Sequence, residues 1–457
     1  METAKTDQIR SKELFKNTII YAIGNFGARV LSFLIVPLYT YYLSPEEMGD
    51  YDLIVTTVSL LLPIITLQIG DAVYAGLLKE ERPQRDTLKS AYGLIFCNLL
   101  IALPIFALIG KLFPIQYINY LYIILIVNVI YSVLQRAVRG LQNQKLFVIS
   151  GLTYTIVFLA LNVWQVVILS RGITAMFISA IIAYICGFLI IIILDKRVLQ
   201  IKGGQNHLKE MLSFSAPLIP NQLNWWVMSF SDRYIIRLIL GSAFNGIYSV
   251  AYKFPTVLQI VFSYFNNSWQ DLNLSEHKEN LGEYYSKIFE KYYVFALALL
   301  LPLTPASKLF IRYTMESRFV DAALYIGFLY LGVVFENFAA FYGVGYLKNG
   351  DTKGAGMTSI GGAIINIVVN LCLITFIGLH AAALSTCAGY LAMWLLRVIQ
   401  TRNTMKIKVN RLKLTSFCLI SFIYSYLMIY TSNIADFILT IVGGMAFLLS
   451  LYLMRKK

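Results

Sequence analysis

Long apolar stretches alternate with short polar connections along nearly the whole chain. A membrane-spanning helix needs about 20 mostly apolar residues, because the hydrocarbon core of a bilayer is about 30 Å thick. Such stretches recur from residue 17 to residue 454 and leave little chain for a soluble domain. The pattern predicts an all-α polytopic membrane protein with about 14 transmembrane helices, at 17–42, 51–74, 88–110, 117–139, 147–170, 173–194, 211–240, 244–267, 288–311, 320–346, 355–377, 379–400, 414–431 and 434–454.

The first apolar stretch is expected to remain in the protein as its first span. It is longer than the apolar region of a secretory signal peptide, which runs for about 7–15 residues. It also carries Arg29 in its interior and lacks a small-x-small cleavage site near its end.

Composition agrees with a membrane protein, since 58% of the residues are hydrophobic and only 14% are charged, against about 25% charged in an ordinary soluble domain. The net charge of +14 could suggest a nucleic-acid partner. The basic residues are instead spread between the spans, which fits the positive-inside rule. We therefore expect no nucleic-acid partner.

The basic residues also predict the orientation. With a cytoplasmic N-terminus, the cytoplasmic segments hold 29 of the 38 basic residues, and both termini face the cytoplasm. The residues placed in outside loops are Lys111, Arg171, Lys308, Arg312 and Arg318.

Cysteine and histidine give no sign of a metal or redox site. All five cysteines fall inside apolar spans without a metal-ligand spacing, and the three histidines are isolated near span ends. No metal and no organic cofactor are expected.

Two pairs of segments point to an internal duplication, a common feature of transporter folds. At an offset of 197, Leu43, Gly49 and Tyr51 match Leu240, Gly246 and Tyr248. At an offset of 206, a second set matches in the same order: Leu141, Asn143, Gly172, Ala175, Ser179 and Tyr184 with Leu347, Asn349, Gly378, Ala381, Ser385 and Tyr390.

The repeat relates six spans to the next six, so both copies enter the membrane in the same direction around a pseudo-twofold axis along the membrane normal. We expect an N-terminal six-helix half (1–200), a C-terminal six-helix half (201–401) and two further helices (402–457), with a cleft between the halves.

Two blocks of residues form recognisable motifs. The first, at the end of the first span, reads Pro37-Leu-Tyr-Thr-Tyr-Tyr-Leu43-Ser-Pro45; the second reads Ser215-Ala-Pro217-Leu-Ile-Pro220-Asn221, Trp225-Trp226, Ser231-Asp232-Arg233-Tyr234 and Gly246-Ile-Tyr248. At these residues the chain resembles the multidrug/oligosaccharidyl-lipid/polysaccharide exporter superfamily, and within it the Wzx-type polysaccharide flippases. The resemblance covers the first twelve spans.

The resemblance implies movement of an undecaprenyl-pyrophosphate-linked oligosaccharide from the cytoplasmic to the outer leaflet of a bacterial inner membrane. That movement would feed O-antigen, capsule or exopolysaccharide assembly, with a polysaccharide polymerase and a chain-length regulator as further partners. One departure is that relatives often carry an arginine where this chain has Ala75-Gly76. A substrate contact by such an arginine is not expected here.

The four basic residues assigned to neither side lie within predicted spans, where each ionisable group costs about 2.5–3.5 kcal/mol to insert. They are Arg29 in the first span, Arg233 and Arg237 in the seventh, and Lys253 in the eighth. Groups of this kind normally face a cavity or a partner. We expect Arg29 and Lys253 to hold the pyrophosphate, with Arg233 or Arg237 assisting on the outward side. The alternative for Arg237 is an extension of its side chain to the outer headgroups.

Three acids are candidates for coupling or gating. Glu336, in the tenth span, could couple transport to a proton or sodium gradient, or could be a structural partner of Arg29 or Lys253. Asp71 is expected to be an interfacial cap or a gate residue, and Asp232 to pair with a neighbouring span. Asn and Gln side chains inside the spans are expected mainly to form hydrogen bonds between helices.

Other functions remain open. Within the same superfamily, a lipid II flippase also handles a pyrophosphate, whereas a drug or cation antiporter usually needs a cavity dominated by carboxylates. A membrane-embedded polymerase or ligase is disfavoured, because the outside loops are short and no acid/base or nucleophile constellation is present. The expected protein is a transporter and not an enzyme.

Overall fold

The computed structural model describes residues 33–79, 83–112, 116–201, 207–275, 281–349 and 351–456. Every regular element in these ranges is helical, which confirms the predicted all-α class. The α-helices are α2 (Val36–Tyr42), α3 (Pro45–Thr66), α4 (Ile69–Leu78), α5 (Gln84–Leu112), α6 (Ile118–Gly140), α7 (Gln144–Asn162), α8 (Ile173–Leu194), α9 (Leu208–Ser215), α10 (Ile219–Ile239), α11 (Ser242–Ser275), α12 (Leu281–Thr314), α13 (Ile326–Asn349), α14 (Thr352–Ile377), α15 (Leu379–Gln400), α16 (Arg402–Met405), α17 (Arg411–Leu427) and α18 (Asn433–Lys456).

Ten helices of the described part are long and apolar enough to cross a membrane. All ten coincide with predicted spans. The predicted spans at 211–240, 244–267 and 414–431 are also helical but fall outside the ten. Two of these, α10 and α11, carry many polar residues, and α17 has only 17 residues.

Two predicted spans are interrupted. The span at 51–74 breaks between α3 and α4, where Leu67 and Gln68 both have positive φ angles, of 47° and 55°. The left-handed region is unfavourable for residues other than glycine, so α3 cannot continue through it. The span at 211–240 breaks at the short 3-10 helix Ala216–Leu218, which contains Pro217. Proline removes a backbone donor and disfavours a continuous α-helix.

The chain forms two compact units. The first contains Leu53–Leu223 and the described residues before Val36, and the second contains Val36–Asp52 and Asn224–Lys457. The stretch Val36–Asp52, which we expected in the N-terminal half, therefore packs with the later helices. The division into halves at residues 200 and 401 stays a prediction.

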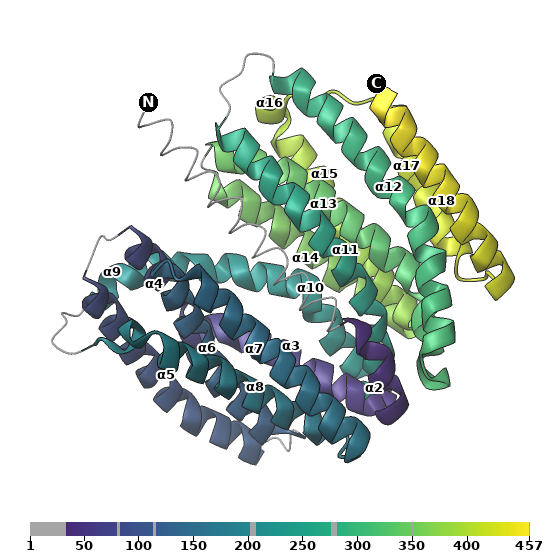
Figure 1. Ribbon diagram of the computed structural model, residues 1–457. Helices are drawn as coiled ribbons and strands as arrows, with labels where there is room; N and C mark the ends of the chain where they lie inside the picture. Colours follow the sequence, from purple (N-terminus) through teal and green to yellow (C-terminus); the bar gives the residue numbers. More distant parts are fainter. Residues whose placement is uncertain are drawn as a thin grey trace. The chain divides into compact units, whose positions relative to one another are not determined.

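In the first unit, α6 lies between α4 and α8, and α7 packs along α8 (Figure 1). Polar side chains join these helices. Gln135 of α6 donates to the hydroxyl of Ser150 of α7 over 2.8 Å, and Asn98 of α5 donates to the carbonyl of Ile65 of α3 over 2.7 Å. Such bonds between helices are expected where no water is available to satisfy polar groups.

In the second unit, α13 forms the core. It packs against α11, α12, α15 and α17, and nearly all of its apolar stretch is buried. By contrast, α18 packs along α12 and is almost wholly exposed (Figure 1). Exposed apolar helices of this kind are stable where lipid, and not water, surrounds them.

The starts of α3 and α11 cross closely within the second unit. A Cβ atom on Gly49 would lie 2.0 Å from the carbonyl oxygen of Ser242, and one on Gly246 would lie 1.9 Å from that of Pro45. Gly49 and Gly246 are equivalent at the offset of 197, and so are Pro45 and Ser242. The contact is therefore reciprocal, as expected where equivalent residues meet at a local twofold axis.

Candidate functional site

The second unit brings two of the predicted basic residues into one charged cluster, formed by Asp52, Asp232, Arg233 and Lys253. The guanidinium Nε of Arg233 lies 2.9 Å from Oδ2 of Asp52. Its Nη1 lies 3.1 Å from Oδ1 of Asp232. Both side chains of this second pair are buried, and a buried charge is costly unless it is paired in this way.

Aromatic and hydroxyl side chains complete the surroundings of Arg233. Its guanidinium carbon lies 4.4 Å from the ring centre of Tyr252 and 5.0 Å from that of Phe230. The hydroxyl of Tyr248 donates to the carboxylate of Asp232, and so does that of Thr386 over 3.5 Å. The prediction that Asp232 pairs with a neighbouring span agrees with these contacts to α11 and α15.

Lys253 differs from Arg233 because its side chain is exposed. It interacts electrostatically with Asp52 and Arg233, yet within the described ranges it forms no ion pair. The ammonium group is therefore the exposed member of the charged cluster, and its charge is not compensated by a direct ion pair within the described residues. A lysine presents a compact charge with three rotatable donors.

Arg237 lies one turn after Arg233 on α10, near the crossing of α3 and α11. Its Nε is 3.7 Å from Oδ1 of Asp50, and its side chain is 41% exposed. The hydroxyl of Ser242 also donates to Asp50. The partial exposure leaves both predicted roles open, an outward substrate contact and an extension to headgroups.

Glu336 lies on α13, facing α11. Its Oε1 accepts a hydrogen bond of 2.7 Å from Nε2 of Gln259. One residue on, Asn337 accepts a bond of the same length from Asn266. The prediction of hydrogen bonds between helices is confirmed for Gln259 and Asn337. The contact shown for Glu336 is thus to an amide and not to Lys253.

Asp71 belongs to the first unit and not to the charged cluster. It lies in the first turn of α4 and forms an ion pair of 3.1 Å with Arg136 of α6. An acid in the first turn interacts favourably with the helix dipole, as a cap would. Arg29 lies outside the described residues, and its place stays a prediction.

Two acids escaped the sequence analysis, Asp52 of the charged cluster and its neighbour Asp50. Asp50 and Asp52 were assigned to a turn and to the start of a span, but α3 begins at Pro45 and includes both. A usable signal existed, because they lie within three residues after the repeated Gly49, whose equivalent, Gly246, lies near the start of α11, the helix that carries Lys253.

The prediction that Lys308 and Arg312 lie in an outside loop is wrong. Both lie within α12, which runs on to Thr314. Lys308 is 1% exposed, with its Nζ 3.3 Å from Oδ2 of the buried Asp436 on α18, and Arg312 reaches the same oxygen over 2.8 Å. Because the acid lies far along the chain, spacing could not reveal the pair.

Arg397, near the end of the predicted span at 379–400, is a further buried cation. It donates to the carbonyl of Ala339 over 2.8 Å and to the hydroxyls of Thr358 and Ser359 over 3.2 Å each. Its donors thus tie α15 to α13 and α14. Within the described ranges, no group of three or more His, Cys, Asp or Glu side chains is placed to hold a metal.

Comparison with known proteins gives a family and a fold. A family model described as "Polysaccharide biosynthesis protein" matches residues 14–269, more than half of the chain. No curated protein sequence matches the chain.

Solved structures of low sequence identity share the fold. The lipid II flippase MurJ in an inward closed conformation is 15% identical, with a TM-score of 0.68 over 96% of this chain and 99% of that one. An inward-facing multidrug resistance MATE transporter is 13% identical, with a TM-score of 0.67, and the match covers 86% of this chain and 95% of that one. The MATE multidrug transporter DinF-BH is 16% identical, with a TM-score of 0.61, and the match covers 87% of this chain and 97% of that one. The predicted polytopic membrane fold is thereby confirmed.

Proposed function

The chain belongs to the family of polysaccharide biosynthesis proteins, and from this premise we propose that it is a flippase for lipid-linked oligosaccharides. The substrate is an undecaprenyl-pyrophosphate-linked repeat unit, moved across a bacterial cytoplasmic membrane by alternating access. Ten apolar helices and a fold shared with MurJ and MATE transporters support a multi-pass transporter. A polysaccharide polymerase and a chain-length regulator are the partners we expect beside it.

The observation that carries the substrate class is the exposed cation Lys253 beside the buried Arg233. A pyrophosphate is a compact anion whose oxygens accept charge-assisted hydrogen bonds from lysine and arginine. Two nitrogens of Arg233, Nε and Nη1, are already paired with Asp52 and Asp232. We therefore assign the direct contact to Lys253 and a supporting positive charge to Arg233.

The remaining predicted residues extend this site. Arg29 is proposed as a second direct contact to the pyrophosphate, and Arg237 as a contact on the outward side. Glu336 is the proposed coupling group, since a carboxylate held by one amide can bind and release a proton or a sodium ion. Asp71 and Asp232 are proposed to stabilise conformations of the transport cycle through their partners.

Complementation of a deletion strain tests both the function and the site. The deletion is expected to remove surface polysaccharide, and the unaltered gene to restore it. Lys253→Gln should reduce the restored polysaccharide about tenfold or more at equal protein level, because a charge-assisted contact contributes roughly 1.5–3 kcal/mol.

Lys287→Gln is the matched control. Lys287 is exposed on α12 and pairs with Glu283 one turn away, over 2.8 Å. It should restore polysaccharide fully. Normal polysaccharide in the deletion strain would reject the function, whereas full restoration by Lys253→Gln would reject only the site.

A lipid II flippase is the second candidate, favoured by the match to MurJ over 96% of this chain. The same deletion strain separates the two. Loss of surface polysaccharide with normal growth supports the oligosaccharide flippase. Lysis with accumulation of lipid II in the inner leaflet would support the second candidate.

A further inference from the structure

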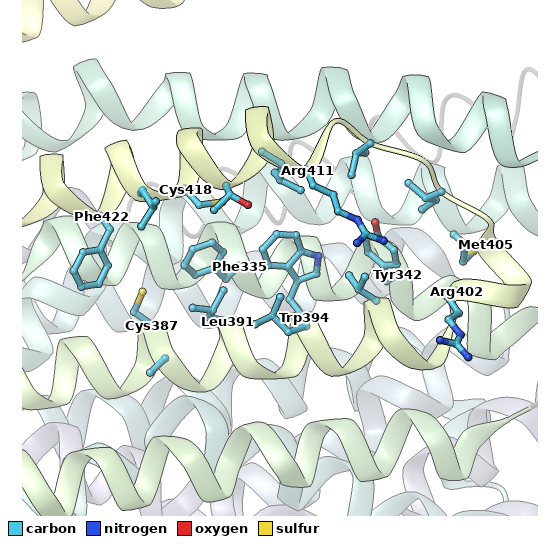
Figure 2. A pocket seen from close by; sticks show the side chains of 18 of the residues that line it. Phe335, Tyr342, Cys387, Leu391, Trp394, Arg402, Met405, Arg411, Cys418 and Phe422 are labelled. Carbon is cyan, nitrogen blue, oxygen red and sulfur yellow. The ribbon is translucent and has the colours of Figure 1, made fainter.

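An elongated pocket of about 840 Å³ opens in the second unit between α15 and α17. Both helices belong to the same bundle around α13, which supplies the floor through Phe335 and Tyr342 (Figure 2). The volume lies within the range of about 300–1,000 Å³ that is usual for ligand sites. The pocket is distinct from the charged cluster, none of whose residues lines it.

The wall on α15 is an apolar stripe at helical spacing. Leu384, Cys387, Leu391 and Trp394 recur every three or four residues and therefore lie on one face. Across the pocket, α17 contributes Leu414, Cys418 and Phe422 among others. Figure 2 shows Cys387, Cys418 and Phe422 gathered at one end. Such a surface suits a hydrocarbon chain.

The other end of the pocket is basic. Arg402, Lys408 and Arg411 line it, from the start of α16, the connection that follows it and the first residue of α17. Figure 2 shows Arg402, Met405 and Arg411 at this end, near Tyr342. The three side chains are exposed, and in the described part of the chain none of them forms an ion pair.

The neighbouring Lys413 makes the contrast clear. Its Nζ lies 2.6 Å from Oε1 of Glu290 on α12, so its charge is already compensated. This stretch of the chain thus includes Lys413, which holds α17 on α12, and three cations that line the pocket mouth with no ion pair to a described acid. This arrangement leaves positive charge where a headgroup phosphate would lie.

We propose that this pocket binds one anionic phospholipid. An acyl chain would lie between α15 and α17, and the phosphate would be held by Arg402, Lys408 and Arg411. Basic pockets between transmembrane helices are a known type of site for anionic lipid headgroups. By the predicted orientation the lipid comes from the cytoplasmic leaflet. The proposal does not depend on the proposed function.

Native mass spectrometry of the full-length protein in detergent tests it, with phosphatidylglycerol and phosphatidylcholine of identical acyl chains as probes. We expect one phosphatidylglycerol to bind about tenfold or more tightly than phosphatidylcholine. Each basic residue near a headgroup contributes roughly fivefold in affinity. The triple variant R402Q/K408Q/R411Q should therefore lose on the order of a hundredfold in affinity for phosphatidylglycerol.

Lys406→Gln is the charge control. Lys406 is exposed in the same segment but does not line the pocket, so the affinity should change less than about twofold. For the apolar wall, Leu391→Trp should fill the pocket and weaken binding roughly tenfold. Ile399→Trp, at a 62% exposed position of α15 outside the pocket, should leave binding unchanged.

Equal affinity for the two lipids, or an unchanged affinity in the triple variant, would overturn the proposal. The proposal would also be overturned if a polyprenyl-linked molecule stayed bound to the purified protein and to every variant except Leu391→Trp. That result would identify the tail of the transport substrate as the occupant of the pocket. The charge variants lie at exposed positions and keep the test valid if Leu391→Trp does not fold.

Discussion

Arg233 presents its donors in a fixed fork, and two carboxylates from different parts of the chain, Asp52 and Asp232, occupy it. Removing one partner of a buried pair costs about 3–5 kcal/mol, because the other charge is left uncompensated. Arg233 is therefore as much a structural residue as a functional one. Lys253 is exposed and can be exchanged at smaller cost, which makes it the better probe of the site.

Asp195 offers a pH-dependent test at the residue scale, outside the membrane spans. Hydrogen bonds from the Arg197 guanidinium, and further ones from Asn143, lower the pKa of Asp195 from 3.8 to about 2. A lowered pKa in the folded state stabilises the protein above about pH 4, and this contribution is lost as the pH falls through about 2.

We expect Asp195→Asn to lower the free energy of unfolding by about 1–2 kcal/mol at pH 7, discounted because Arg197 is half exposed. The difference in Tm between the unaltered protein and Asp195→Asn should become smaller as the pH is lowered from 5 to about 3. Asp321→Asn, at an exposed carboxylate after α12, is the control. A gap that does not change with pH would contradict the assignment.

At the scale of helices, the crossing of α3 and α11 depends on two glycines that have no room for a Cβ atom. Gly246→Ala would place its methyl group 1.9 Å from the carbonyl oxygen of Pro45, so the helices must separate. Overpacking of this kind costs roughly 1–3 kcal/mol. The crossing also holds Asp50 and Asp52 beside α10, so the charged cluster depends on it.

We expect Gly246→Ala to lower the Tm of the protein in detergent. The Tm is measured by size-exclusion chromatography of samples heated to increasing temperatures. Gly356→Ala is the matched control on α14, where a Cβ atom would meet nothing within 4 Å. There the better helix propensity of alanine should leave stability unchanged or raise it by up to about 1 kcal/mol. Equal Tm values for the two variants would show that the crossing is not tight.

For the molecule as a whole, large apolar side chains remain exposed on the described surface, with Leu238 at 83%, Phe376 at 82% and Leu412 at 80%. These exposures are costly in water and favourable in lipid. The helices therefore need a bilayer, and the distribution of basic residues predicts the direction in which they cross it.

Reporter fusions test this direction. Green fluorescent protein fused after Lys457 should fluoresce, because the C-terminus is predicted to be cytoplasmic. Alkaline phosphatase fused after Arg171, in the predicted outside loop before α8, should be active. Alkaline phosphatase that is active when fused at either position would place both positions outside. An even number of spans would then separate them, and not the nine predicted.

Sequence alone determined the properties that depend on local composition. Stretches of about 20 apolar residues must form helices in a bilayer, since no water is present to satisfy the backbone. The class, the family and most spans therefore followed from hydropathy and a few motifs. Three of the four basic residues singled out within spans lie on α10 and α11, and these two helices carry three of the four residues of the charged cluster.

Only the tertiary structure decided which charges meet. Asp52 reaches Arg233 across 181 positions of the chain, and Asp436 reaches Lys308 across 128. Hydropathy reports the cost of burying a charge but not the distant partner that offsets it. For the same reason Lys308 was wrongly placed in a loop. The sequence also could not show that Lys253 is exposed whereas Arg233 is paired, because this difference depends on their neighbours in the fold.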